Sequence, residues 1–112
     1  MLKKNELEIY ELMLLVKPTL MEQNIVEKLE FYKTFLTKQG SQLMVKNFGK
    51  KPLSYLIKGF DTGISLQLVY LGNGDLVKKI NTEIQRDESI LRAITTKLNG
   101  KKVSKDYSPL FN

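Results

Sequence analysis

Few residues in this chain could perform covalent or acid–base chemistry. The 112 residues include no cysteine and no histidine. Disulfides, thiolate nucleophiles, cysteine-ligated metal sites and imidazole bases are therefore excluded, and the lack of cysteine fits a reducing compartment. Any reaction would have to depend on carboxylates, lysines or hydroxyl groups.

The carboxylates do not form an evident catalytic or metal-binding set. Asp87 and Glu88 are adjacent and could serve acid–base chemistry or bind a cation. No third ligand is near them in the sequence, so we interpret the pair as an exposed turn. Glu6, Glu8 and Glu11 fall on both faces of an extended segment and do not converge. We therefore expect no catalytic residue, no metal, no cofactor and no small-molecule substrate.

The basic residues are a stronger chemical signal. Lysines and arginines number 18 against 12 acidic residues, for a net charge of +6. This balance suits a polyanion such as nucleic acid, because phosphate contact needs only a cation of suitable reach. Any single lysine is more simply a solvated rim residue, but together they exceed what a rim usually carries. The candidates lie at or near the ends of the stretch GKKPLSYLIKG (49–59), in or before the last predicted strand, or near the chain ends: Lys46, Lys50, Lys51, Lys58, Arg86, Arg92, Lys3, Lys4, Lys101, Lys102 and Lys105.

The first elements that must position these residues are a strand and a helix. IYELMLLV (9–16) is apolar on both faces apart from Glu11, which predicts a central strand. Pro18 ends it, and the segment Thr19–Glu22 has the form of a capping box for a helix that runs to about Gln39. Gly40 follows, where a left-handed cap residue is needed. The apolar positions at helical spacing are Ile25, Leu29, Tyr32 and Leu36, flanked by Val26 and Phe35.

A strand pair follows, and it contains the bracketed stretch. Residues 42–58 are predicted as a strand in two pieces, with a bulge or bend at Gly49 and Pro52 and with Pro52 on a sheet edge. Residues 59–63 are predicted as the hairpin loop and 64–71 as the return strand. The alternating apolar face of the second piece is expected to build the core; it consists of Leu53, Tyr55 and Ile57.

A second helix and a last strand complete the order. After a turn at 72–75, the helix carries its apolar residues inward, namely Leu76, Val77, Ile80 and Ile84. Residues 89–98 are predicted as the last strand. The order predicts an α+β, ferredoxin-like βαββαβ sandwich, with a four-stranded antiparallel sheet and two helices on one face. With 42% hydrophobic residues, we expect a single domain over 1–98 and a basic, flexible C-terminal tail over 99–112.

Two functions found on this fold are not favoured by the residues. A phosphatase needs a glycine-rich phosphate cradle at a strand-to-helix turn, and the segment 17–19 is short and lacks glycine. An RNA-recognition motif stacks bases on aromatic residues of its central strands. Those strands carry one tyrosine each, Tyr10 and Tyr70, so base stacking on the sheet is not expected. The aliphatic free face suits a protein partner better.

A membrane association is also not expected. No apolar run approaches the ~20 residues that cross a bilayer. The start, MLKKNELEIY, has no apolar stretch behind its lysines and so does not have the form of a signal peptide.

Three local strings resemble one known family, the sixth protein of the bacterial-type small ribosomal subunit (the S-six family). YELMLLVKPTL (10–20) resembles its first strand, and DESILRAITTK (87–97) its final strand. GKKPLSYLIK (49–58) resembles its signature, although Pro52 stands where a polar or basic residue is usual. The resemblance covers about residues 9–98.

The resemblance implies a non-catalytic constituent of the small ribosomal subunit, in a bacterial cytoplasm or a plastid stroma (chloroplast). It implies binding to the central domain of small-subunit (16S-type) rRNA together with ribosomal protein S-eighteen. By position, the resemblance implies RNA contacts from Lys51, Lys58, Arg92 and Lys97, and approximately from Arg86. The prediction that Lys101 and Lys102 also bind RNA depends on their charge alone. The partner surface is predicted to include Tyr10, Tyr55 and Tyr70. The alternative is a ferredoxin-like regulatory or interaction domain that self-associates through its sheet.

Overall fold

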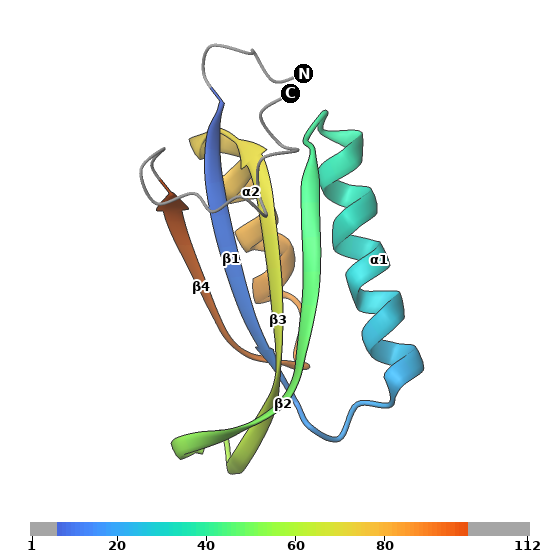
Figure 1. The fold of residues 1–112 in the computed structure, drawn as a ribbon, viewed down its shortest axis with the longest axis vertical. Helices are drawn as coiled ribbons and strands as arrows, with labels where there is room; N and C mark the ends of the chain where they lie inside the picture. The colour runs from blue at the N-terminus through green and yellow to red at the C-terminus, as the bar shows by residue number, and fades with distance from the viewer. Residues whose placement is uncertain (1–6, 99–112) are drawn as a thin grey trace.

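The computed structural model describes residues 7–98, which form one sheet and two helices. The elements are β1 (Glu8–Val16), α1 (Glu22–Lys38), β2 (Leu43–Ile57), β3 (Phe60–Gly72), α2 (Gly74–Gln85) and β4 (Ile90–Leu98). The strands pair antiparallel in the order β2-β3-β1-β4, and β1 and β3 are central. In Figure 1, α2 lies behind β1 and β3 and α1 lies alongside β2, and both helices contribute to the same core. The predicted ferredoxin-like fold is confirmed.

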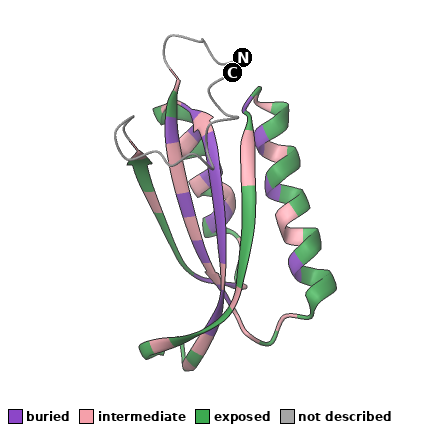
Figure 2. Ribbon diagram, viewed as in Figure 1, coloured by how far each residue is buried: buried purple, intermediate pink, exposed green. Residues whose placement is uncertain are grey.

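The core lies between the sheet and the helices. Alternate residues of β1 and β3 form this core together with apolar side chains at helical spacing on α1 and α2. Figure 2 shows buried residues on β1 and β3 and at intervals along both helices. The largest fully buried side chains of this core are Tyr32, Tyr70, Leu12, Leu14, Leu36, Leu66, Leu68, Leu76, Ile80 and Val16. Leu29 is only partly buried and Val26 is exposed. The predicted inward face of α1 is therefore right for Ile25, Tyr32 and Leu36, and too wide at its margins.

The N-terminus of α1 differs from the predicted capping box. Pro18 occupies the second position of a turn that the Leu20 amide closes by donating to the Lys17 carbonyl at 3.3 Å. Proline favours that position because its φ is already fixed near the required value. Thr19 is part of this turn and is not the N-cap of the helix. The N-cap is Met21, whose side chain makes no capping hydrogen bond. Residue 22 consequently starts the helix instead of reaching back to Thr19.

The C-terminus of α1 is as predicted. Gly40 has φ +86°, in the left-handed region that favours glycine. Its amide donates to the Thr37 carbonyl at 3.0 Å, and the Ser41 amide donates to the Leu36 carbonyl at 3.1 Å. This pair of bonds is the Schellman motif, which satisfies the last carbonyls of a helix.

The β2–β3 hairpin is longer and tighter than predicted. β2 is continuous, with the expected bulge where Phe48 has no partner between Asn47 and Gly49. Pro52 lies on an edge strand, as predicted. The connection is a two-residue turn, Lys58-Gly59, with φ of +49° and +85°, and not the predicted loop of 59–63.

The far part of this hairpin does not contribute to the core. We call residues 46–62 the hairpin arm; none of them is buried, and the end of the arm extends past both helices (Figures 1 and 2). The expectation that Leu53, Tyr55 and Ile57 build the core is therefore wrong. Alternation alone predicted a buried face, but no helix lies over this part of the sheet.

Candidate nucleic-acid interface

Among residues 7–98, the elements with an excess of positive charge are the hairpin arm and β4. The arm carries four lysines against one aspartate, and β4 carries Arg92 and Lys97 with no acidic residue. The helices are electrically balanced: α1 has three acidic and three basic residues, and α2 has two of each. A polyanion would therefore be attracted to the arm and β4 more than to the helix layer.

The arm combines cations with exposed apolar side chains. Lys50 pairs with Ile64 and Lys51 with Gly63, so these neighbours lie on opposite faces of the hairpin. Lys58 occupies the tip. The exposed large hydrophobic residues of the arm are Phe48, Tyr55 and Leu56. Basic groups interleaved with aromatic rings are typical of surfaces that bind nucleic acid.

Arg92 connects β4 to the arm. Its guanidinium lies over the Tyr55 ring, 5.7 Å from the ring centroid, within the range of a cation–π contact. Tyr55 nevertheless remains 57% exposed. Arg92 was predicted to contact RNA and Tyr55 to contact a protein partner, but the two side chains lie next to each other.

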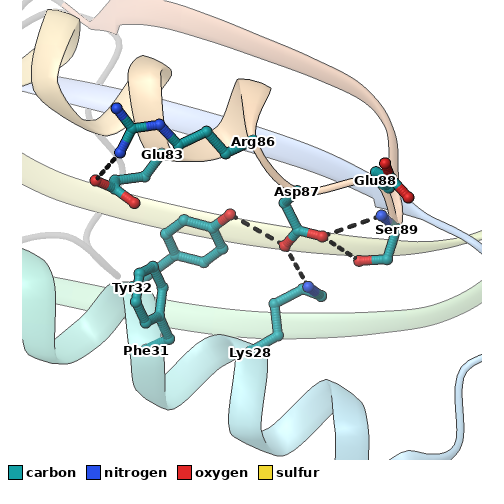
Figure 3. A pocket seen from close by; sticks show the side chains of 8 residues that line it. All are labelled: Lys28, Phe31, Tyr32, Glu83, Arg86, Asp87, Glu88 and Ser89. Carbon is teal, nitrogen blue, oxygen red and sulfur yellow. Dashed lines mark hydrogen bonds and ion pairs between the residues drawn. The ribbon is translucent and has the colours of Figure 1, made fainter.

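The other predicted RNA contacts are elsewhere. Arg86 extends along α2 toward Glu83, with 3.5 Å between Nη1 and Oε1 (Figure 3). Lys97 lies near Glu8, with 3.6 Å between Nζ and Oε1, about 16 Å from Arg92 along β4. The predicted set is thus not one cluster, because only Lys51, Lys58 and Arg92 belong to the arm or contact it. Lys3, Lys4, Lys101, Lys102, Lys105 and the predicted tail lie outside the described residues.

Tyr10 and Tyr70 do not form the predicted partner surface. They are paired across β1 and β3, and their rings stack at 5.7 Å on the face that the helices cover. Tyr70 is fully buried, so its assignment to a surface is wrong, and Tyr10 packs against the core. Burial, and to a lesser extent Tyr10, raises the pKa of the Tyr70 hydroxyl. Within residues 7–98 this hydroxyl has no hydrogen-bond partner.

The opposite face of the sheet is aliphatic, as predicted. A smaller cluster there consists of Ile9, Val69, Met44, Leu71 and Leu98. Gln67 donates to Glu11 at 2.8 Å on the same face, and Ile94 is 54% exposed. The side chains of this face are more suitable for a protein partner than for stacked bases.

Asp87 follows α2 and connects it to α1 through hydrogen bonds. Figure 3 shows its carboxylate turned toward α1, at one side of a pocket of about 550 Å³. It accepts hydrogen bonds from Lys28, from the Tyr32 hydroxyl at 3.3 Å, and from the Ser89 hydroxyl and amide at 2.6 and 3.0 Å. Burial raises the pKa of Asp87, but the hydrogen bonds from Lys28 and Ser89 and the charge of Lys28 outweigh it and lower the pKa.

The exposed-turn interpretation of the acidic pair is therefore correct for Glu88 and incorrect for Asp87. The Asp-x-Ser spacing could have indicated the local turn, in which an aspartate accepts from the backbone two residues on. Lys28 and Tyr32 have no local signal, being more than 50 residues away. The described residues contain no group of three or more potential metal ligands. No helix among them is long and apolar enough to span a bilayer.

Comparisons with known proteins identify the family and the fold. The family model for ribosomal protein S6 matches residues 9–97. The chain is 33% identical over 96 residues to small ribosomal subunit protein bS6 of Picosynechococcus, covering 85% of this chain and 84% of that one. It is 37% identical over 101 residues to protein bS6c of Porphyra purpurea, covering 86% and 90%. The fold is similar to that of 30S ribosomal protein S6 from Thermotoga maritima, with a TM-score of 0.77 at 20% identity, over 82% and 88% of the two chains.

Proposed function

The chain belongs to the ribosomal protein S6 family, and from this premise we propose that it binds small-subunit (16S-type) rRNA through the hairpin arm and Arg92. As a family member it is a structural protein of the small ribosomal subunit, in a bacterial cytoplasm or a plastid. We propose that it performs no catalysis and that it binds the central domain of the rRNA together with ribosomal protein S-eighteen.

The distribution of charge supports this proposal. The helices are balanced, whereas the arm has a net charge of +3 from four lysines and one aspartate. Cations on both faces and at the tip of a protruding hairpin can approach phosphates on separate strands of folded RNA. Arginine adds a planar fork that can hold a phosphate through two hydrogen bonds.

The first experiment is a salt titration of rRNA binding. Each phosphate that a cation neutralises contributes a slope of about −0.9 to log K against log salt on a duplex. If about five are neutralised, the affinity of the purified protein for a central-domain rRNA fragment should fall by several powers of ten per decade of salt. A slope near zero would remove the RNA proposal.

A substitution at Arg92 tests the assignment of the surface. Arg92→Ala should weaken rRNA binding and leave the free energy of unfolding almost unchanged, because Arg92 is exposed. Lys33→Ala is the matched control: it also removes one exposed cation, but from the balanced helix α1. Unfolding of the Arg92 variant with affinity retained would mean that Arg92 has a structural role.

The aliphatic face of the sheet supports the second part of the proposal, pairing with ribosomal protein S-eighteen. Ile94→Asp would place a charge at its exposed position, and we expect this to weaken co-sedimentation with S-eighteen. The same substitution also tests the alternative function. Self-association of the unmodified chain without S-eighteen, lost in Ile94→Asp, would favour an interaction domain that pairs with itself.

A further inference from the structure

A hollow of about 540 Å³ lies between the tip of the hairpin arm and the start of β4. Three cations line it, and they come from three segments that are distant in the sequence: Lys17, Lys58 and Arg92. Two carboxylates, Asp87 and Glu88, also line it. The volume is within the range of about 300–1,000 Å³ that is usual for ligand sites.

Backbone contacts hold together the segments that carry the three cations. The Lys17 amide donates to the Ser89 carbonyl at 2.9 Å, which joins the end of β1 to the turn before β4. Arg92 is paired with Leu15 in the sheet. Lys58 is in the left-handed conformation, with φ +49°, in the two-residue turn that joins β2 to β3. The turn therefore fixes the position of its backbone at the tip of the hairpin arm.

The electrostatic balance of the hollow favours an anion. Asp87 turns toward α1 and is already bonded to Lys28, Tyr32 and Ser89 (Figure 3), which offsets its charge. Glu88 is exposed and is the remaining negative group. Within residues 7–98, Lys17, Lys58 and Arg92 form no ion pair with an acidic side chain. Three cations therefore oppose one carboxylate that is not offset.

Tyr55 adds a different kind of surface beside the hollow. Arg92 both lines the hollow and lies over the Tyr55 ring at 5.7 Å. More than half of that side chain is exposed. Aromatic rings and guanidinium planes are the groups on which unpaired nucleobases stack.

We propose that this corner holds one unpaired nucleotide of the rRNA, with its phosphate on Lys17, Lys58 and Arg92 and its base stacked on Tyr55. The inference rests on the proposed rRNA function and refines it. A regular RNA helix keeps its bases stacked inside, so it could offer phosphates but no free base face. The nucleotide is therefore expected in a bulge, loop or junction, and Tyr55 is reassigned from the protein partner to RNA.

The test uses the full chain and a central-domain rRNA fragment, with one variant for each half of the site. Tyr55→Leu removes the ring and should lower affinity by about 5- to 150-fold, the range for loss of one base stack, with the salt slope unchanged. Tyr55→Phe keeps the ring and should bind like the unmodified chain. Lys17→Ala should make the salt slope shallower by about 0.7–0.9, whereas Lys33→Ala should affect it less.

Ultraviolet cross-linking identifies the nucleotide directly. We expect a cross-link from Tyr55 to one base, and that base should be reactive to chemical probing in the free RNA and protected in the complex. A cross-link to a paired base, or none, would overturn the inference. So would a Tyr55→Leu protein that keeps its RNA affinity but loses S-eighteen, because Tyr55 would then belong to a protein interface.

The outcomes separate this inference from the broader function. If the unmodified chain binds rRNA with a steep salt slope but Tyr55→Leu and Lys17→Ala do not differ from it, the nucleotide site is wrong and the function stands. If the unmodified chain does not bind rRNA, the proposed function itself fails. Circular dichroism and a denaturant titration of each variant would show that a loss of affinity is not a loss of fold.

Discussion

At the scale of single residues, the carboxylate of Asp87 is the best-connected polar group among those described. It joins Lys28 and Tyr32 of α1 to Ser89 before β4. Its side chain is only 22% exposed, and hydrogen bonds to ionised groups are stronger than neutral ones. It therefore contributes to the attachment of α1 to the end of α2.

Asp87→Asn should lower the free energy of unfolding by about 1–3 kcal/mol at pH 7. The pKa of Asp87 in the folded protein is lowered, below the value of about 3.9 for an unfolded chain. Its contribution is therefore complete above about pH 4 and is lost as pH falls through the folded-state pKa. Denaturant titrations from pH 7 to pH 2 should show the difference between the two proteins narrowing below about pH 4. A constant difference would show that the charge is not responsible.

Tyr70 is the opposite case, a buried hydroxyl with no partner in the described part of the chain. Leaving such a group unpaired costs about 1–3 kcal/mol. Tyr70→Phe should therefore raise the free energy of unfolding by about 1 kcal/mol, measured by denaturant titration. Tyr32→Phe is the control, because its hydroxyl donates to Asp87 and its loss should be destabilising. A destabilised Tyr70→Phe protein would mean that the hydroxyl is bonded after all.

At the scale of the elements, local sequence rules predicted correctly the features that depend only on neighbouring residues. Gly40 ends α1 and Gly49 lies at a bulge because both adopt φ values that other residues avoid. The capping box failed because Pro18 imposes a competing turn on Thr19. Burial of the second half of β2 failed for a non-local reason: alternation predicts which side chains share a face, but not whether anything covers that face.

Helix α1 offers a direct test of how burial determines stability. Leu36 is fully buried, whereas Leu29 lies at the edge of the core. Leu36→Ala should cost about 2–5 kcal/mol of unfolding free energy. Leu29→Ala should cost less, about 1–2 kcal/mol, because Leu29 buries less apolar surface on folding than Leu36 does. Equal costs in a denaturant titration would mean that the rotation of α1 about its axis is misjudged.

At the scale of the whole molecule, a neutral helix layer is joined to a positively charged hairpin arm. The three local strings were sufficient to predict the family, and the hydrophobic periodicity was sufficient to predict the element order. They were not sufficient to predict the hollow, since Lys17 and Arg92 are 75 positions apart and meet only after β1 and β4 pair. Lys17 was missed for that reason, and Arg86 was included although its side chain lies along α2.

This separation of charge predicts unequal effects from equal losses of charge. Lys50→Ala with Lys51→Ala removes two cations from the arm, and we expect the salt slope of rRNA binding to become shallower by about 1.4–1.8. Lys33→Ala with Lys38→Ala removes two from α1 and should change it much less. Equal effects in the salt titration of rRNA binding would mean that the attraction comes from total charge and not from the arm.

The irregular edge of β2 affects how readily the free protein can pair with a second copy of itself. A straight outer strand presents a row of unpaired amides and carbonyls on which a second chain can grow toward amyloid-like stacks. Here Pro52 has no amide to donate, the bulge at Phe48 interrupts the row, and the lysines repel an identical chain. The β2 edge of the sheet is therefore poorly suited to pairing with the same edge of a second copy.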